Sequence, residues 1–275
     1  MKTKAELDNI AKNIRADVVK MACNSKATGA HIGGSFSVAE ILAVLYGSVM
    51  NVSPSDCENK YRDRLILSKS HAAIALYSAL SQVGFITRDE IDNAMVGKSF
   101  FYKHPQKALE YGIECSGGSL GMGLSFEMGM GYALRLDENS SSRVFVIVGD
   151  GECNEGSIWE AAASIIHYNL NNVIVVVDNN RLQIDGTNDE VLRMGSMKER
   201  WSSMGFDVIE VDGHDVEELQ DELSIYRNKP TVILANTIKG KGVSFTENAC
   251  EWHVGRLTNE QRDIALQEIM GHDRD

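Results

Sequence analysis

The feature that most constrains the fold is a strand–helix–strand pattern between residues 144 and 182. Two short runs of β-branched and apolar residues, 144–148 and 173–177, are each bounded by turn residues, as buried parallel strands are. Between them, alanines and apolar residues recur at helical spacing over residues 155–167. Crossovers of this kind join parallel strands and are nearly always right-handed. The sequence therefore predicts a parallel α/β unit whose helix opens just after Gly151.

Polar residues follow both predicted strands. Asp150 comes shortly after the first strand and Asn180 shortly after the second. Because neighbouring parallel strands lie about 4.8 Å apart and end at the same edge of the sheet, these side chains should lie side by side where ligands of open α/β sheets bind. A carboxylate and an amide oxygen suit Mg²⁺, and a helix start flanked by Gly149 and Gly151 suits a phosphate group. The sequence predicts a site for a magnesium diphosphate.

Two other interpretations of this stretch compete. Asp150 could simply cap a helix, and the Asn–Asn pair after the second strand could simply form a turn. A dinucleotide site of the Rossmann type is the other alternative, but its fingerprint needs a third glycine at position 154, which is asparagine. Two further Gly-x-Gly pairs, which begin at Gly121 and Gly129, fail in the same way.

Composition narrows the range of partners. A hydrophobic content of 43% and a charged content of 24% are ordinary for a globular protein. The net charge of −12 argues against nucleic acid or an anionic membrane as a partner. The five cysteines are widely spaced and form no Cys-x-x-Cys pair, which favours a reducing cytoplasm, with Cys153 a buried inert thiol. Neither a signal peptide nor an apolar run of about 20 residues is expected.

The remaining pattern alternates strands and helices along the chain. Further strands are predicted at residues 65–67, 207–211 and 231–235, and helices at 4–23, from 35 or 37 to 50, at 190–204, at 216–227, and from the capping box at Thr258 onward. Such alternation is typical of an α/β fold with a mostly parallel sheet and helices on both faces. No linker or repeat divides the chain, so residues 1–275 are expected to form a single domain.

Four of the seven histidines are predicted to lie in loops that meet at the carboxyl edge of the sheet: His31, His71, His104 and His253. Taken singly, each would more often be a structural histidine, but together they favour a site. Histidine suits proton transfer because its pKa lies near neutral pH. The other three, His167, His214 and His272, are expected to occupy ordinary helix or surface positions.

The central motif resembles the thiamine-diphosphate motif in the form that transketolases use. The matching segments are Gly149-Asp-Gly151, Glu155-Gly, Glu160-Ala and Asp178-Asn-Asn180. The four histidine turns and the segment Gly118-Ser-Leu-Gly-Met-Gly123 also resemble elements of that family, although the glycines of this segment could simply form a tightly packed helix start. Departures from the family pattern are Ala30, Ser70 and Val254 in place of glycine and Ser119 in place of proline; Val254 could alter the acceptor pocket.

The resemblance implies a set of site residues. The metal would be held by the side chains of Asp150 and Asn180 and by the backbone carbonyl of Leu182. The histidines at 31, 71, 104 and 253 would be catalytic: His31, His104 and His253 would bind substrate hydroxyls and move protons, and His71 would lie close to the cofactor and the donor. The cofactor would be bound by His71, Gly118, Ser119, Leu120, Gly149, Asp150, Gly151, Glu155, Asn180 and Ile238. Glu155 and Glu160 would lie between the two cofactor sites of a dimer, although both could be ordinary surface charges of a helix.

The same resemblance implies a cofactor and a partner. The cofactor is thiamine diphosphate, with Mg²⁺ or another divalent cation such as Ca²⁺ or Mn²⁺. Matching motifs cover only the diphosphate-binding domain of a transketolase, so the pyrimidine-binding and C-terminal domains are expected on a separate chain, in a heterotetramer. The N-terminal subunit of such a split transketolase would move a two-carbon ketol unit from a ketose phosphate, or a modified ketose such as a sulfo-sugar, to an aldose phosphate.

Two other functions stay open at this point. The chain could be part of another thiamine enzyme, such as a deoxyxylulose-phosphate synthase or a 2-oxo-acid dehydrogenase, although His31 and His104 favour ketol transfer. It could also be a non-catalytic interaction protein that keeps the fold. Intact Asp150, Asn180 and the four loop histidines argue against that alternative, since a decayed site should have lost some of them.

Overall fold

A computed structural model describes residues 1–25, 28–137 and 141–271 of the chain. These residues form a five-stranded sheet in the order β1-β2-β3-β5-β4. Every pairing within this sheet is parallel. The strands are β1 (Arg64–Leu67), β2 (Val144–Gly149), β3 (Val173–Asn179), β4 (Asp207–Asp212) and β5 (Thr231–Asn236). The predicted α/β fold is confirmed, and β2 and β3 are neighbours, as the strand–helix–strand pattern indicated.

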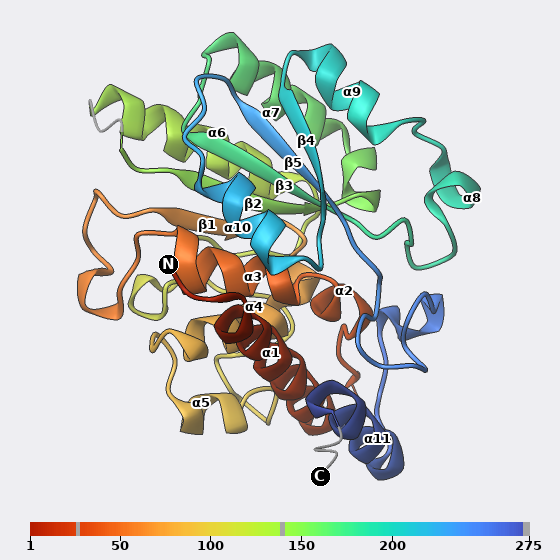
Figure 1. Cartoon of the computed structure of the whole chain (residues 1–275). Coiled ribbons are helices and arrows are strands. Elements are labelled where there is room, and N and C mark those ends of the chain that lie inside the picture. The colour runs from red at the N-terminus through yellow and green to blue at the C-terminus, as the bar shows by residue number, and fades with distance from the viewer. Residues whose placement is uncertain (26–27, 138–140, 272–275) are drawn as a thin grey trace.

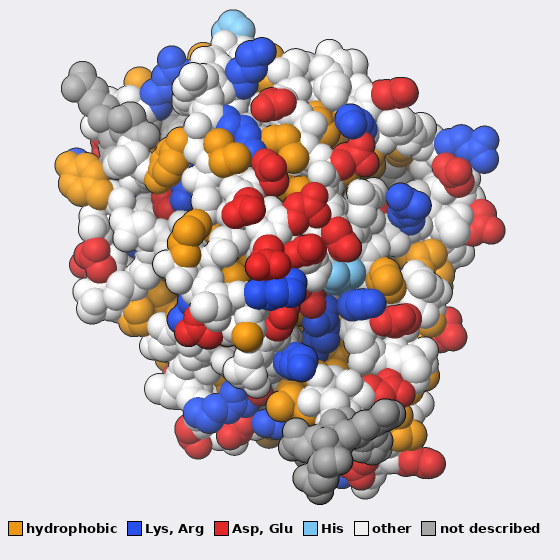
Figure 2. All heavy atoms as spheres, in the orientation of Figure 1, with side chains coloured by type: hydrophobic (Ala, Val, Ile, Leu, Met, Phe, Trp, Pro, Cys, Tyr) orange, Lys and Arg blue, Asp and Glu red, His pale blue; other side chains and the backbone are white. Residues whose placement is uncertain are grey.

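Helices cover both faces of the sheet (Figure 1). The helices α6 (Met122–Leu136), α7 (Gly156–His167) and α9 (Met197–Met204) lie on one side. The other side carries α1 (Lys4–Asn24), α3 (Ala39–Val44), α4 (Ala73–Gln82) and α10 (Val216–Ser224). The remaining helices are α2 (Gly33–Phe36), α5 (Arg88–Asp92), α8 (Asn188–Leu192) and α11 (Asn259–Met270). Acidic side chains gather over the face that carries α10 (Figure 2).

Alternation along the strands builds one core on each face of the sheet. In β2, Phe145 and Ile147 join the core under α1, α3 and α4, whereas Val144, Val146 and Val148 join the core under α6 and α7. Successive side chains of a strand point to opposite faces, so a strand buried on both sides has to be apolar throughout. This is why the central strands read as unbroken apolar runs.

The helix expected at residues 190–204 is in fact two helices. Between α8 and α9, Gly195 has a φ of 72°, which a helix cannot contain, and Ser196 then caps α9 by accepting a hydrogen bond from the Glu199 backbone. The helix expected at residues 216–227 ends at Ser224, because Ile225 is extended.

The helix expected from residue 35 or 37 is also wrong in detail. It begins earlier, as α2 at Gly33, and is interrupted where Val38 leaves helical geometry before α3. It then ends in a π-helical turn, Leu45–Val49, rather than continuing as an α-helix. The segment still belongs to a single core on one face of the sheet, which includes most of its apolar residues.

The helix after β2 begins later than its sequence indicates. Residues Gly151–Asn154 form a 3₁₀ turn, Glu155 is extended with φ −73° and ψ 133°, and α7 starts only at Gly156. The prediction of an α-helix opening just after Gly151 is therefore wrong. A short turn, not the helix itself, follows Asp150.

Two further properties concern the whole described chain. None of its described helices is both long and apolar enough to cross a membrane. All five cysteines have free thiols, and Cys153 is buried, as expected. His272 lies outside the described residues.

Candidate active site

A cavity of about 380 Å³ lies at the carboxyl ends of the central strands. It gathers most of the residues that the sequence singled out, although they come from segments far apart in the chain. Its lining includes His31, His71, His104, Gly118, Leu120, Gly149, Asp150, Gly151, Glu155, Asn180, Leu182 and His253. The expectation that these loops meet at one edge of the sheet is confirmed.

The four histidine rings form one cluster. The ring centroid of His31 lies 5.6 Å from that of His71, 5.8 Å from that of His104 and 5.4 Å from that of His253. The centroids of His71 and His253 are 5.2 Å apart. Close packing holds the cluster, since a methyl group on Gly34 would come within 3.0 Å of the His71 ring. The arrangement places several imidazoles within reach of one small ligand.

Burial keeps three of these imidazoles neutral. It lowers the pKa of His31 to about 4 and that of His253 to about 3, and in both cases neighbouring positive groups lower it further. Burial also lowers the pKa of His71 well below its usual value. The Nδ1 atom of His253 is buried without a partner within the described chain. At neutral pH these rings can each both donate and accept a hydrogen bond, as groups that exchange protons with sugar hydroxyls must.

Asp150 and Asn180 lie on neighbouring strand ends and line the same cavity. One carboxylate oxygen of Asp150 accepts from the Gly151 backbone at 2.7 Å and the other from the Arg181 backbone. Asp150 does cap the short turn after it, so the capping interpretation holds alongside the ligand one. Burial and the nearby Asp178 raise the pKa of Asp150 to about 6. A cation beside it would favour the charged carboxylate.

The orientation of the Asn180 amide is fixed by its neighbours. Its nitrogen donates to the Asp178 carboxylate at 3.0 Å, and its oxygen accepts from the Leu182 backbone at 3.1 Å. The carbonyl of Leu182 accepts from the ammonium of Lys239 at 3.0 Å. A carbonyl oxygen has two lone pairs, so this bond leaves one free. The three ligands expected from the resemblance are thus all hard oxygen atoms near one cavity.

Comparisons with known proteins agree with this geometry. The family model described as "Transketolase, thiamine diphosphate binding domain" matches residues 7–275. The chain belongs to the transketolase family. Membership of this family identifies the chain as the thiamine-diphosphate-binding part of a transferase. The resemblance inferred from its sequence motifs is confirmed.

Relatives of two different lengths are similar to this transketolase chain. It is 40% identical over 250 residues to an apulose-4-phosphate transketolase subunit of Phocaeicola vulgatus, covering 89% of this chain and 87% of that one. It is 36% identical over 242 residues to a 6-deoxy-6-sulfo-D-fructose transketolase subunit of Clostridium sp., covering 87% and 88%. The transketolase structure from Leishmania mexicana superimposes with a TM-score of 0.88 at 25% identity, over 99% of this chain but only 42% of that chain.

A buried glutamate that no sequence motif singled out joins three loops of this transketolase site. Glu152 accepts hydrogen bonds from the Ser68 hydroxyl, from the Gly121 backbone at 2.7 Å and from the Gly149 backbone at 3.0 Å. Burial raises its pKa, which these bonds only partly oppose. Its sole sequence signal was a carboxylate within a turn at the end of a buried strand.

A buried ion pair at the cavity was also missed. The ammonium of Lys69 pairs with the carboxylate of Asp178, which also accepts from Ser37 at 2.7 Å and from Thr237. Both charged side chains are almost fully buried. Neighbouring charge lowers the pKa of Asp178 despite the opposing effect of burial. The pair joins β1, β3, α2 and the turn after β5, and it supports Asn180 through Asp178.

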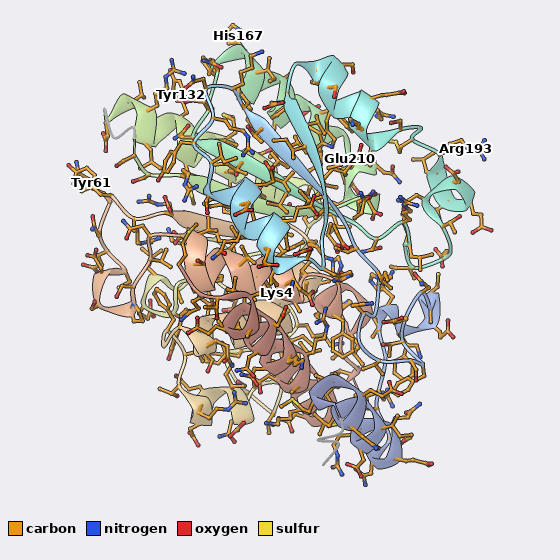
Figure 3. The ribbon with its side chains drawn as sticks, in the orientation of Figure 1. Lys4, Tyr61, Tyr132, His167, Arg193 and Glu210 are labelled. Atoms are coloured by element: carbon orange, nitrogen blue, oxygen red, sulfur yellow. The ribbon has the colours of Figure 1, made fainter. Side chains whose placement is uncertain are left out.

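The expectation that His214 is an ordinary surface residue is wrong. Its Nε2 accepts a hydrogen bond from the Ile238 backbone at 2.8 Å, so the ring proton is on Nδ1, which lies 3.0 Å from Glu40. Glu40 in turn holds the guanidinium of Arg15 through two bonds of 2.6 Å. His214 therefore connects the helices beneath the sheet to the turn that follows β5. His167 does point outward at the end of α7, as expected (Figure 3).

Two expected cofactor residues do not line the main cavity. Ser119 lies in a smaller hollow with Phe126, and Ile238 lies in an adjoining cavity with His214. Tight packing at the helix start explains part of the glycine segment, because a methyl group on Gly121 would come within 2.4 Å of the Ser157 hydroxyl. Val254 lines none of these three cavities; its side chain covers Gly29.

Proposed function

We propose that this chain is the N-terminal, diphosphate-binding subunit of a split transketolase that transfers a two-carbon ketol unit. The observation that carries the proposal is the single cavity in which the four histidines face the oxygen ligands at the ends of β2 and β3. Imidazoles suit the proton transfers of sugar hydroxyls, and hard oxygen ligands suit a metal diphosphate. Neither feature alone would distinguish a transketolase from other thiamine enzymes.

Mg²⁺ is the cation that fits this donor set, with Ca²⁺ or Mn²⁺ as substitutes. Asp150, Asn180 and the Leu182 carbonyl would hold it, and diphosphate oxygens would complete its coordination. Across the described residues, no three His, Cys, Asp or Glu side chains gather into a metal site of their own. A cation here would therefore depend on one carboxylate together with amide, carbonyl and ligand oxygens, which fits a metal that arrives with a diphosphate.

The residues of the chain would divide the chemistry with the cofactor. Thiamine diphosphate would supply the nucleophilic carbon that carries the two-carbon unit. His31, His104 and His253 would bind the sugar hydroxyls and transfer their protons, while His71 would lie near the cofactor and the donor. Because the rings of His31, His71 and His253 are neutral, they can accept a proton from a hydroxyl without first losing one.

The partner we propose is a chain with the pyrimidine-binding and C-terminal domains, in a heterotetramer with two copies of each subunit. Residues 1–275 would then be a single diphosphate-binding domain. Leu120, Met122 and Phe126 support this, since their side chains are 38%, 42% and 44% exposed around the start of α6, beside the cavity. An exposed apolar surface of this kind marks an interface. The free cysteines favour a cytoplasmic location.

For the substrates, we propose a ketose donor, either phosphorylated or modified, and an aldose phosphate acceptor. Two relatives of similar length are named for apulose 4-phosphate and for 6-deoxy-6-sulfo-D-fructose, so chains of this type are named for different sugars. Val254 does not line the cavity, so its replacement of glycine need not change the acceptor pocket.

The test is to purify the chain with and without the product of the neighbouring reading frame. Ketol transfer should need both chains, and a ketose rather than pyruvate should serve as the donor. Robust turnover by the 275-residue chain alone would refute the split-subunit proposal. Asp150→Ala should abolish Mg²⁺-dependent binding of thiamine diphosphate in a calorimetric titration without unfolding the chain; wild-type affinity in that variant would rule out the assigned metal site.

A further inference from the structure

A buried donor without a partner in the described chain belongs to a residue that lines the candidate active-site cavity. The side-chain nitrogen Nε2 of Gln183 is shielded from solvent, and no group in the described part of the chain accepts a hydrogen bond from it. Gln183 lines the same cavity as Asp150 and Asn180. Buried polar groups are nearly always paired, so an orphan amide beside a ligand cavity calls for an explanation.

The side chain of Gln183 lies directly over Gly151. A methyl group on Gly151 would come within 2.8 Å of both Cγ and Cδ of Gln183 and within 3.2 Å of its Oε1. Only glycine at position 151 leaves room for this arrangement. The amide group is therefore held against the turn at the end of β2, where the sequence predicts the diphosphate.

The backbone of Gln183 is fixed from both sides. Its N–H donates to the Gly186 carbonyl at 2.8 Å, and its own carbonyl accepts from the ammonium of Lys239 at 2.8 Å. Lys239 is itself buried. With the backbone held in this way and the side chain packed over Gly151, less conformational freedom remains to be lost when the amide binds a ligand.

The nearby backbone donors are already in use. The Gly151 N–H donates to Asp150 at 2.7 Å, and the Gly149 N–H donates to Glu152 at 3.0 Å. An anion at this turn cannot take these two protons without displacing a carboxylate. The Gln183 amide carries two N–H groups next to them, and its nitrogen is uncommitted within the described residues.

We propose that Gln183 is a cofactor-binding residue that donates from Nε2 to an oxygen of the diphosphate. Diphosphate oxygens only accept hydrogen bonds, so a neutral amide is a suitable partner next to the cation. The assignment rests on the proposed thiamine-diphosphate site and adds to it a ligand outside the recognised motif.

Inorganic pyrophosphate with Mg²⁺ tests this contact within the 275-residue chain, because it needs only the diphosphate end of the site. Calorimetric titration would compare the wild type with Gln183→Met, which keeps the length of the side chain, and Gln183→Glu. We expect about 10- to 100-fold weaker binding for the methionine variant, the range for losing a hydrogen bond to a charged group, and a larger loss for glutamate. Gln82→Met, on α4, is the matched control and should bind as the wild type does.

The outcomes separate this contact from the proposed function. Unchanged or tighter binding by Gln183→Met, with binding abolished in Asp150→Ala, would overturn the Gln183 assignment and leave the diphosphate site standing. No binding of pyrophosphate or thiamine diphosphate by the wild type, alone or with its partner, would overturn both. Thermal unfolding of each variant without ligand shows whether the fold is kept, so a weakened variant with wild-type stability supports the contact.

Discussion

Glu127 should make the stability of this transketolase chain fall as the pH rises. Its side chain is fully buried on α6, and neither carboxylate oxygen has a hydrogen-bonding partner of good geometry within the described chain. Burial raises the pKa of this carboxyl well above its usual range, and a backbone contact with Ile174 only partly opposes that rise. The folded chain thus retains a proton that the unfolded chain loses.

The size of the effect follows from proton linkage. Where the unfolded state has lost this proton and the folded state has kept it, each pH unit lowers the free energy of unfolding by about 1.4 kcal/mol. The stability that depends on the retained proton of Glu127 is fully present below the pKa of an exposed glutamate. It is lost as the pH rises towards the pKa of Glu127 in the folded chain. Between pH 5 and pH 7, Glu127 should therefore cost up to about 3 kcal/mol relative to a residue that does not ionise.

Urea unfolding of the wild type and of Glu127→Gln at several pH values would measure this difference. The quantity to compare is the slope against pH, because a buried glutamine has unpaired groups of its own and its absolute stability is uninformative. Glu160→Gln, at an exposed position of α7, is the matched control and should retain the wild-type slope. Parallel pH profiles for the wild type and Glu127→Gln would refute the reasoning.

Three further predictions have defined outcomes. His31→Ala and His104→Ala should bind thiamine diphosphate normally in the assembled enzyme but lose about 10²–10⁴-fold in turnover, the range for a lost acid–base group. The control His167→Ala should keep a turnover near that of the wild type. An equal loss of cofactor affinity in both loop variants would mean that His31 and His104 are structural. His214→Phe should lower the free energy of unfolding by about 1–3 kcal/mol in urea, because it leaves a backbone N–H unpaired, and a change below about 0.5 kcal/mol would contradict this role. Burial lowers the pKa of Lys239, which lines the cavity, to about 8. Affinity for inorganic pyrophosphate should therefore weaken as the pH rises through 8 and the ammonium group loses its charge. Lys239→Arg should remove this dependence of the affinity on pH.

Much of this arrangement followed from local sequence. The apolar runs of β2 and β3 are short, β-branched and bounded by turn residues, so their type was determined before any contact was known. Once both were parallel neighbours, chain geometry alone brought Asp150 and Asn180 to the same edge of the sheet. Histidines in the loops at that edge then had to converge.

The missed features depend on contacts between distant segments. His214 lies 174 residues from Glu40 along the chain, and its role is invisible until the sheet brings α3 and the turn after β5 together. The delayed start of α7 has a local cause that competed with helix propensity, since Asp150 caps a 3₁₀ turn and Glu155 is extended. The role of His214 depends on tertiary contacts and the delayed start of α7 on capping, and the periodicity of apolar residues in the sequence indicates neither.

The distribution of charge at the cavity indicates that a diphosphate bound there would need a cation. Three carboxylates, those of Asp150, Glu152 and Asp178, lie at or just below the cavity. Only two ammonium groups lining the cavity, those of Lys69 and Lys239, offset their charge among the described residues. Lys69 is already paired with Asp178. A diphosphate brings further negative charge to a buried site where repulsion between like charges is poorly screened. The 3₁₀ turn offers little relief, because the Gly149 and Gly151 amides are bonded to the carboxylates themselves. A divalent cation between Asp150 and the diphosphate would turn that repulsion into attraction, and it would also lower the raised pKa of Asp150.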